Sequence, residues 1–234
     1  MKTLIVIPAY NEQENIKQVI ENLINNYSEF DYIVINDCSS DNTRKILEEN
    51  KYNYINLPVN LGIGGGVQTG YKYALEHGYD IAIQMDGDGQ HDPKFFKDVI
   101  EPIEKGNADI VIGSRFIQNE GFQSTIVRRL GINFLSSLIS IVSGTKVKDV
   151  TSGYRAINRK FIEIYAQEYA QDYPEPEAIV NAAMYNARIL EYPVVMFERL
   201  GGESSISPIK SIYYMIKVSI AIILYRITFD KRRT

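Results

Sequence analysis

Short apolar runs alternate with helical patterns through the first half of this chain, and no other feature constrains the fold as strongly. The runs are rich in β-branched residues, as strands are, and neighbouring runs lie roughly 25 to 30 residues apart. They are Thr3–Ile7, Tyr32–Ile35, Tyr52–Leu57, Asp80–Met85 and Asp109–Gly113. Strands connected through helices favour a parallel sheet that has helices on both faces. The sequence therefore predicts an α/β fold with a mostly parallel sheet.

Length, charge and cysteine content narrow the class of protein. A chain of 234 residues is large enough for one sizeable core, so a single main domain is expected over residues 1–207. The net charge of -4 argues against a nucleic-acid binder, because such proteins need a basic face. Cys38 is the only cysteine and cannot form an internal disulfide, which favours a reducing compartment. No stretch reaches the roughly 18 uncharged apolar residues that a membrane-spanning helix needs.

Polar clusters follow four of the predicted strands at the point where each strand ends. They come after Ile7, Ile35, Met85 and Gly113. In open parallel sheets, ligands bind in the crevice beyond the carboxyl ends of the strands. The four clusters are therefore expected to converge on one binding site.

The most informative of these clusters lies in the segment Ile81–Pro93, which reads IAIQMDGDGQHDP. In extended chain, residues i and i+2 point the same way, so Asp86 and Asp88 can face one ion and Gln90 extends the row. Oxygen ligands favour Mg²⁺ or Mn²⁺, and such an ion would stabilise a diphosphate leaving group. An isolated Asp-x-Asp is also compatible with a plain acidic turn. Its position after a buried strand, with three other polar strand ends, favours the metal site.

The polar segments after two further predicted strands can each be interpreted in two ways. The glycine-rich NLGIGGGVQTG, which includes Gly65, precedes a helix expected from Val67 to His77. It is either a phosphate cradle or a turn that needs close backbone packing, and it matches neither the dinucleotide fingerprint nor the P-loop. Asp37 either accepts hydrogen bonds from a base or ribose, or caps a helix together with Asp41.

The second half of the chain departs from the alternation. Val127–Ser143 and Ile209–Ile227 have apolar residues at helical spacing and predict two amphipathic helices. Between them, KVKDVTSGYRAINRK is expected to be a polar turn. The segment Glu177–Ile189 is then predicted to be a helix and Tyr192–Glu198 a strand.

Basic residues flank both amphipathic helices. Arg128 and Arg129 lie in the first turn of one, and Lys231–Arg233 follows the other. Apolar faces edged with arginine and lysine suit helices that lie in a membrane interface, and ordinary core packing is the alternative. Residues 208–234 are therefore expected to form an amphipathic helix with a basic tail. This helix would contact the membrane, a small membrane protein or a second copy of the chain.

Seven segments of this chain occur in the order found in family 2 glycosyltransferases. They are PAYNEQENI, NDCSSDNT, NLGIGGGVQTGY, MDGDGQHDP, IGSRF, VTSGYRAINR and EYPVVMFERLGGESS, and they cover about residues 3 to 207. The chain most resembles the polyprenyl-phosphate branch, which contains dolichol-phosphate mannosyltransferases and undecaprenyl-phosphate glycosyltransferases. The resemblance implies a GT-A (Rossmann-like) fold. It also implies inverting transfer of a hexose from a nucleotide sugar, with a UDP-sugar favoured over GDP-mannose, to a polyprenyl phosphate.

The resemblance also implies a role for individual residues. The donor nucleotide sugar would be bound by Pro8, Tyr10, Glu12, Asp37, Gly65 and Asp86, and the metal by Asp86, Asp88 and Gln90. The acceptor phosphate would be bound by Arg115, one of Arg128 and Arg129, Ser152, Arg155 and Arg199. Asp86, Asp88 and Arg115 are the expected catalytic residues, together with Asp149 as a catalytic or positioning carboxylate. A guanidinium fork matches phosphate geometry, although surface salt bridges are the alternative for the arginines.

The nature of the acceptor decides whether a general base is needed. A lipid phosphate is already an anion, so positioning and electrostatics can supply most of the catalysis. A saccharide hydroxyl needs a base, and family members that act on saccharides usually have an acidic pair where this chain has Thr151-Ser152-Gly153. Glu175 and Glu177 are candidate bases or polar loop residues.

Two alternatives to the polyprenyl-phosphate enzyme stay open at this point. One is a transferase that extends a surface polysaccharide, and the other is a catalytically silent membrane-associated scaffold. The favoured hypothesis places the chain at the cytoplasmic face of the cell membrane, as a peripheral protein in cell-envelope glycan synthesis or protein glycosylation.

Overall fold

The computed structural model describes residues 1–123, 125–198 and 208–233. Within them the chain forms a seven-stranded sheet in the order β3-β2-β1-β4-β6-β5-β7. In chain order the strands are β1 (Thr3–Ala9), β2 (Asp31–Asn36), β3 (Tyr54–Asn56), β4 (Ile81–Gln84), β5 (Ile110–Ser114), β6 (Arg155–Asn158) and β7 (Ile189–Pro193). β6 runs antiparallel to both of its neighbours, β4 and β5, and every other pair is parallel. The sheet is therefore mixed but mostly parallel, as predicted.

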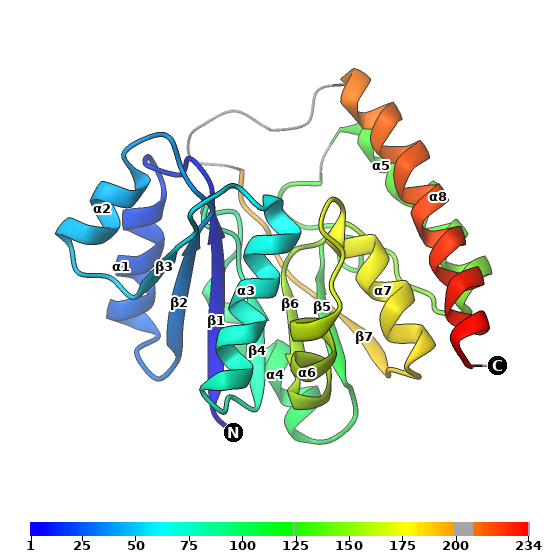
Figure 1. Ribbon diagram of the computed structural model, residues 1–234, viewed down its shortest axis with the longest axis horizontal. Helices are drawn as coiled ribbons and strands as arrows, with labels where there is room; N and C mark the ends of the chain where they lie inside the picture. Colours follow the sequence, from blue (N-terminus) through cyan, green and yellow to red (C-terminus); the bar gives the residue numbers. More distant parts are fainter. Residues whose placement is uncertain (124, 199–207, 234) are drawn as a thin grey trace.

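Helices cover both faces of this sheet (Figure 1). They are α1 (Ile16–Asn26), α2 (Thr43–Glu49), α3 (Gly62–Glu76), α4 (Phe96–Glu104), α5 (Ile126–Ser143), α6 (Arg159–Gln167), α7 (Pro174–Met184) and α8 (Pro208–Arg233), with a 3-10 turn η1 (Pro93–Phe95) before α4. Successive side chains of β1 point to opposite faces of the sheet. Leu4 and Val6 belong to the core on the face covered by α3 and α5–α8. Ile5 and Ile7 belong to the core on the face covered by α1, α2 and α4. This two-sided burial explains why the strands are continuously apolar.

The five strands predicted in the first half are confirmed, but the reading of the second half needs correction. The segment expected to be a polar turn contains β6 and the first two residues of α6, Arg159 and Lys160. The predicted helix ends early, at Met184, because Asn186 adopts a left-handed conformation with φ 56°. The following strand is β7, so the strand predicted at Tyr192–Glu198 begins too late.

The starts of two helices in the first half also differ from the prediction. Asn11 with Glu14 three residues later is close to a capping box and predicts a helix from Asn11. Helix α1 instead begins at Ile16, because Asn11 has φ 55° and its side chain accepts a hydrogen bond from the N–H of Ser40 at 2.8 Å. Helix α3 begins at Gly62, inside the glycine-rich segment. A Cβ on Gly64 would lie 2.0 Å from the Ala170 carbonyl oxygen. Close backbone packing therefore accounts for this glycine.

The two predicted amphipathic helices, α5 and α8, are confirmed and lie together at one end of the molecule (Figure 1). They pack on each other, and a Cβ on Gly131 of α5 would lie 3.2 Å from the sulfur of Met215 in α8. Val218 and Ile222 of α8 are fully buried in the core shared with the sheet. The division of the chain into 1–207 and 208–234 stays a prediction. Over the described part of the chain, we find no helix with the length and hydropathy to cross a bilayer.

Candidate active site

The carboxyl end of β1 lies beside the acidic loop that follows β4. A Cβ on Gly87 would lie 3.3 Å from the carbonyl oxygen of Pro8, and a Cβ on Gly66 would lie 3.7 Å from the Pro8 side chain. Pro8 is thus enclosed between helix α3 and the acidic loop. Just beyond it, Tyr10 is exposed, as a residue that contacts a ligand would be.

Glu12 is buried and bonded within the protein. Its N–H donates to Oγ1 of Thr43 at 2.8 Å, and its carboxylate accepts from the side-chain amide of Asn15 at 2.9 Å. These bonds join the segment after β1 to the first turn of α2 and to the start of α1. Glu12 therefore shapes the loop after β1, and its contact with the donor stays a prediction.

Asp37, at the carboxyl end of β2, is buried and anchors the start of α3. Its carboxylate accepts a hydrogen bond from the N–H of Leu61 at 2.7 Å. Burial raises the pKa of Asp37, while the N–H groups of Leu61 and Gly62 act in the opposite direction. Asp41, by contrast, accepts from the N–H of Thr43 at 2.9 Å, at the start of α2. Both aspartates therefore support the start of a helix, but neither is an N-cap residue, because the N-caps are Leu61 for α3 and Asn42 for α2. A base or ribose contact of Asp37 stays a prediction.

Gly65 lies in the first turn of α3 and is buried. A Cβ at this position would lie 2.4 Å from Cβ of Leu61, so the space beside the glycine is already filled by the protein. This packing favours the structural interpretation of the glycine-rich segment, and a donor contact of Gly65 stays a prediction.

The acidic loop after β4 is held in place by its own residues. The backbone N–H of Asp86 donates to Nδ1 of His91 at 3.0 Å, and Nε2 of the same ring lies 3.8 Å from the Asp86 carboxylate. The His91 ring also stacks on Tyr154 of the neighbouring segment, with ring centroids 5.0 Å apart. His91 is therefore a loop contact, and it fixes the orientation of Asp86.

Asp88 and Gln90 continue the row beyond Asp86. Asp88 accepts a hydrogen bond from the N–H of Gln90 at 3.0 Å, which closes a tight turn. The Gln90 amide donates to the Phe197 carbonyl at 3.2 Å, and the Phe197 N–H donates to the Gln90 carbonyl at 2.9 Å. The segment after β7 therefore runs along the acidic loop.

The antiparallel strand β6 brings a third segment to the acidic loop. A Cβ on Gly153, just before this strand, would lie 3.0 Å from the Asp86 carboxylate, so a larger residue there would have to displace this carboxylate. Glu175, in the first turn of α7, also approaches this position. Burial is the main cause of the raised pKa of Glu175, Asp86 raises it further and Arg155 lowers it. Partial burial and the negative charge of Asp172 raise the pKa of Glu177 as well.

The oxygen donors of this loop fit a hard divalent ion. Across the described residues, no group of three or more His, Cys, Asp and Glu side chains is placed to hold a metal by itself. The loop supplies the carboxylates of Asp86 and Asp88 and the amide of Gln90, at the partly exposed end of β4. Mg²⁺ and Mn²⁺ accept such a partial set, because waters and substrate phosphate oxygens complete their coordination. The residues present therefore fit a metal that binds together with a diphosphate.

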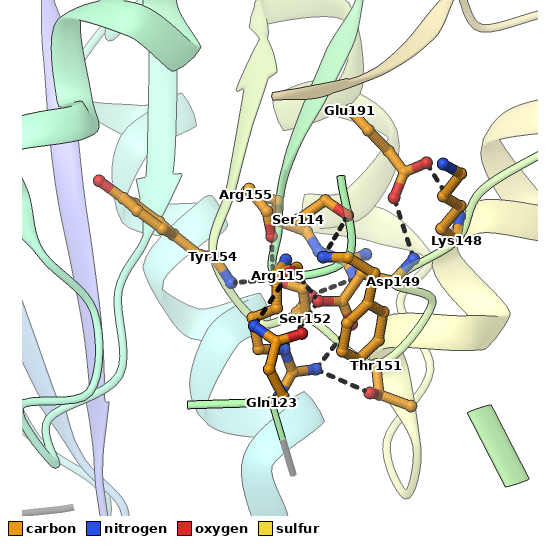
Figure 2. A network of polar contacts seen from close by, with 12 residues as sticks. Ser114, Arg115, Gln123, Lys148, Asp149, Thr151, Ser152, Tyr154, Arg155 and Glu191 are labelled. Atoms are coloured by element: carbon orange, nitrogen blue, oxygen red, sulfur yellow. Dashed lines mark hydrogen bonds and ion pairs between the residues drawn. The ribbon is translucent and has the colours of Figure 1, made fainter. Parts of the chain in front are cut away.

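Arg115, which directly follows β5, forms a buried ion pair with Asp149 (Figure 2). The guanidinium of Arg115 donates to the two carboxylate oxygens of Asp149 at 2.7 and 2.6 Å, and the Arg115 N–H adds a third bond at 3.0 Å. Asp149 has no exposed surface, and Arg115 also donates to Thr151 at 3.2 Å. The geometry therefore favours the positioning interpretation of Asp149, and its role in the reaction stays a prediction.

Ser152 and Arg155 are buried in the same network (Figure 2). The Ser152 hydroxyl donates to the Gly113 carbonyl at 2.6 Å, and Arg155 donates to the carbonyls of Ser152 at 2.7 Å and Glu175 at 3.2 Å. Nε of Arg155 is buried and has no hydrogen-bond partner within the described residues. Both side chains thus hold β5, β6 and α7 together, and their contact with the acceptor stays a prediction.

Arg128 and Arg129 lie in the first turn of α5 and face different surroundings. Arg129 stacks on Phe116, with its guanidinium carbon 3.4 Å from the ring centroid, and that of Arg115 lies 5.0 Å from the same centroid. Arg128 is exposed, but surrounding protein atoms and the positive charge of Arg115 lower its pKa. The structure therefore brings Arg115, Arg128 and Arg129 together. Arg199 lies outside the described residues.

A polar pocket of about 380 Å³ adjoins these arginines. It is lined by Phe116, Asn119, Arg129, Asn133, Ser136, Ser137 and Lys148. Two cations and several neutral donors are what a phosphate group needs. Sequence reasoning missed Lys148, although it stands next to Asp149, because nothing in the sequence pairs it with a residue on α5.

A family model described as "Glycosyl transferase family 2" matches residues 4–165, which is more than half of the chain. The chain belongs to glycosyl transferase family 2. This finding confirms the resemblance seen in the sequence and makes the protein a glycosyltransferase, so the scaffold alternative is not retained.

Relatives of this glycosyltransferase carry names that refer to lipid acceptors. It is 31% identical over 216 residues to the undecaprenyl-phosphate mannosyltransferase of Micrococcus luteus, with 88% of each chain covered. It is 33% identical over 211 residues to the UDP-N-acetylglucosamine–dolichyl-phosphate N-acetylglucosaminyltransferase of Methanococcus voltae, with 81% of this chain and 83% of that protein covered.

Solved structures support the GT-A fold. Glucosyl-3-phosphoglycerate synthase from Mycobacterium tuberculosis, in complex with Mn²⁺, UDP-glucose and phosphoglyceric acid, superposes with a TM-score of 0.70. The match covers 96% of this chain and 79% of that chain at 19% identity. At this identity the likeness shows the fold alone.

Proposed function

We propose that this glycosyltransferase moves a hexose from a nucleotide sugar to a polyprenyl phosphate, with inversion at the anomeric carbon and with Mg²⁺ or Mn²⁺ as cofactor. One observation carries the proposal: acidic residues for a donor diphosphate and arginines for an acceptor phosphate gather at the same edge of the sheet. The names of the two relatives support a lipid phosphate acceptor. The Mn²⁺ and UDP-glucose of the structural neighbour favour a metal and a UDP-sugar over GDP-mannose.

The donor side of the proposed reaction rests on the acidic loop. Asp86, Asp88 and Gln90 would hold the metal, which when bound would neutralise the diphosphate as it leaves. His91 fixes the position of Asp86 through the bond to its backbone N–H. Pro8, Tyr10, Glu12, Asp37 and Gly65 are the proposed contacts of the nucleotide sugar, and they follow the ends of β1 and β2 and the start of α3.

The acceptor side rests on the arginines of β5 and α5. Arg115, Arg129 and Lys148 would hold the acceptor phosphate, and the polar pocket beside Phe116 makes Arg129 a better candidate than Arg128 for direct contact. Asp149 keeps the Arg115 guanidinium in place. The bound phosphate is already an anion, so its oxygen can attack the anomeric carbon directly and the diphosphate departs from the opposite side. This step inverts the configuration and needs no general base.

Glu175 is the residue that favours the alternative function, transfer of the sugar to a saccharide acceptor. Its carboxylate is buried near Asp86, where a general base for a hydroxyl acceptor would be useful. Arg155 also donates a hydrogen bond to the Glu175 carbonyl, which gives this part of α7 a structural role that needs no general base. The acceptor assay therefore has to distinguish the two products.

The test supplies labelled UDP-glucose, UDP-N-acetylglucosamine or GDP-mannose together with undecaprenyl phosphate. We expect a chloroform-extractable, acid-labile product that disappears with EDTA and returns with Mn²⁺ or Mg²⁺. Asp88→Asn and Arg129→Gln should each lower turnover about a hundredfold or more. The matched controls Asp80→Asn and Arg159→Gln, which lie away from the site, should leave it within about twofold. A water-soluble labelled saccharide as the only product, or turnover that EDTA does not affect, would contradict the proposal.

We also propose that the reaction takes place at the cytoplasmic face of the cell membrane, in cell-envelope glycan synthesis or protein glycosylation. A polyprenyl phosphate is embedded in a bilayer, so the enzyme has to work at the membrane surface to reach it. The single cysteine, Cys38, fits a reducing compartment.

A further inference from the structure

Helices α5 and α8 each expose a continuous stripe of large apolar side chains. On α5 the stripe contains Leu130, Phe134 and Ile141, which are 65%, 55% and 82% exposed. On α8 it contains five residues between 43% and 57% exposed: Ile216, Ile220, Ile223, Leu224 and Ile227. Spacings of four and seven residues on α5, and of three, four and seven residues from Ile220 on α8, place the members of each stripe on one side of their helix. We call these eight side chains the apolar face.

The apolar face is not the side of the helices that packs on the protein. α5 buries Ile132, Leu135 and Ile139 against the core, and α8 buries Val218 and Ile222. Each helix therefore has two apolar sides, of which only one is used in folding. Exposing so many large apolar side chains together is unfavourable in water and indicates a binding surface.

Charge is distributed unevenly between these helices and the rest of the chain. α5 and α8 together contain eight Lys and Arg residues and one Asp. The whole chain has 25 Lys and Arg against 29 Asp and Glu, which leaves 17 against 28 for the remainder. An acidic protein thus carries a basic pair of helices at one end, which is the charge that an anionic lipid surface attracts.

The polar pocket of the active site opens beside the apolar face. Ser137 lines this pocket, and on α5 it lies three residues after Phe134 and four before Ile141. Arg129, which also lines the pocket, directly precedes Leu130 of the stripe. A phosphate in the pocket and an apolar chain along the stripe would therefore be neighbours.

We propose that the apolar face is a docking surface for a bilayer that contains anionic lipids, with α5 and α8 lying in the membrane interface. The apolar stripes enter the acyl region, and the net positive charge of the two helices is attracted to the anionic headgroups. The pocket with Arg129 and Lys148 is then held at headgroup level, where the phosphate of a lipid acceptor lies. This last point rests on the proposed function, whereas the docking itself does not.

The experiment is flotation of the full chain with vesicles that lack polyprenyl phosphate, in the absence of nucleotide sugar. Vesicles of phosphatidylcholine alone are compared with vesicles that also contain phosphatidylglycerol, at low and high salt. The variants are Ile141→Glu on α5 and Ile220→Glu on α8. Ile24→Glu is the matched control, because Ile24 is a similarly exposed isoleucine on α1, at the opposite end of the molecule (Figure 1).

We expect the native protein and Ile24→Glu to float with the anionic vesicles, less so at high salt. Each face variant should bind about tenfold more weakly or worse, since inserting one isoleucine is worth about a decade in affinity. The face variants should keep native thermal stability and should still glycosylate a short, detergent-soluble polyprenyl phosphate. Because the vesicles contain no substrate, a failed transfer assay and failed docking are separate results.

Two results would overturn the docking proposal. One is that the native protein does not bind anionic vesicles, or that Ile24→Glu weakens binding as much as the face variants do. The other is that light scattering finds a dimer that Ile141→Glu converts to monomers while no vesicle binding is seen. In that case a second copy of the chain covers the apolar face.

Discussion

The buried pair of Arg115 and Asp149 makes the strongest quantitative prediction. Asp149→Asn keeps the shape of the side chain but removes the charge that balances Arg115, which is itself only 8% exposed. The amide also turns an N–H₂ group toward a guanidinium that needs acceptors at 2.7 and 2.6 Å. Leaving one partner of such a pair buried and unbalanced costs about 3–5 kcal/mol. For a chain of this length, that loss lowers the melting temperature by about 6–20 °C.

Urea unfolding at neutral pH measures this loss, and a double variant tests its cause. Arg115→Met combined with Asp149→Asn removes the unbalanced charge, so it should be more stable than Asp149→Asn alone. The control is Asp172→Asn, which breaks an exposed ion pair with Lys217 and should change the free energy of unfolding by about 1 kcal/mol or less. If Asp149→Asn unfolds at the native urea concentration and only turnover falls, Asp149 acts on the substrate and our reasoning is wrong.

Two further predictions concern stability. Asp109 accepts hydrogen bonds from Arg188 that lower its pKa, so its contribution is present above about pH 4 and is lost as the pH falls through the folded-state value. Asp109→Asn should therefore be less stable than the native protein at neutral pH, and urea midpoints in increasingly acidic buffer should converge; a constant gap would contradict this. Gly64→Ala should cost about 1–3 kcal/mol because its Cβ would meet the Ala170 carbonyl at 2.0 Å. Gly66→Ala, with its nearest contact at 3.7 Å, should be neutral or stabilising in the same melting experiment, and equal losses in both variants would argue against the packing explanation.

The sequence predicts best those elements whose pattern is local. The strands from β1 to β5 are short apolar runs, and α5 and α8 are long stripes, so each is recognisable without its neighbours. Strand β6 is not, because Arg155 and Asn158 at its ends are polar and only Ala156 and Ile157 between them are apolar. It is a strand because β4 and β5 bond to it from both sides, which no local pattern reveals.

The candidate site was predictable in composition but not in its internal contacts. The acidic loop and the arginines were identified from motifs, and strand order explains why they gather at one edge. The bond between Arg115 and Asp149 joins residues 34 positions apart and depends on β5 lying next to β6. The tight packing of Gly64 on Ala170 likewise requires the fold. Sequence reasoning therefore named candidate residues that the fold brings to one edge of the sheet, while the fold determines which side chains support others.

The antiparallel direction of β6 has a consequence for how this enzyme can change. β5 ends and β6 begins at the same edge of the sheet, on adjacent strands. The excursion between them, residues 115–154, therefore leaves and re-enters the sheet at neighbouring points. It contains α5, the polar pocket and the Arg115–Asp149 pair. With the acceptor side assigned as we propose, an insertion or exchange within this excursion would alter what accepts the sugar without moving the strands that present the acidic loop. Acceptor preference is in this sense modular, and chimaeras joined at the ends of β5 and β6 are the natural design for transferring it.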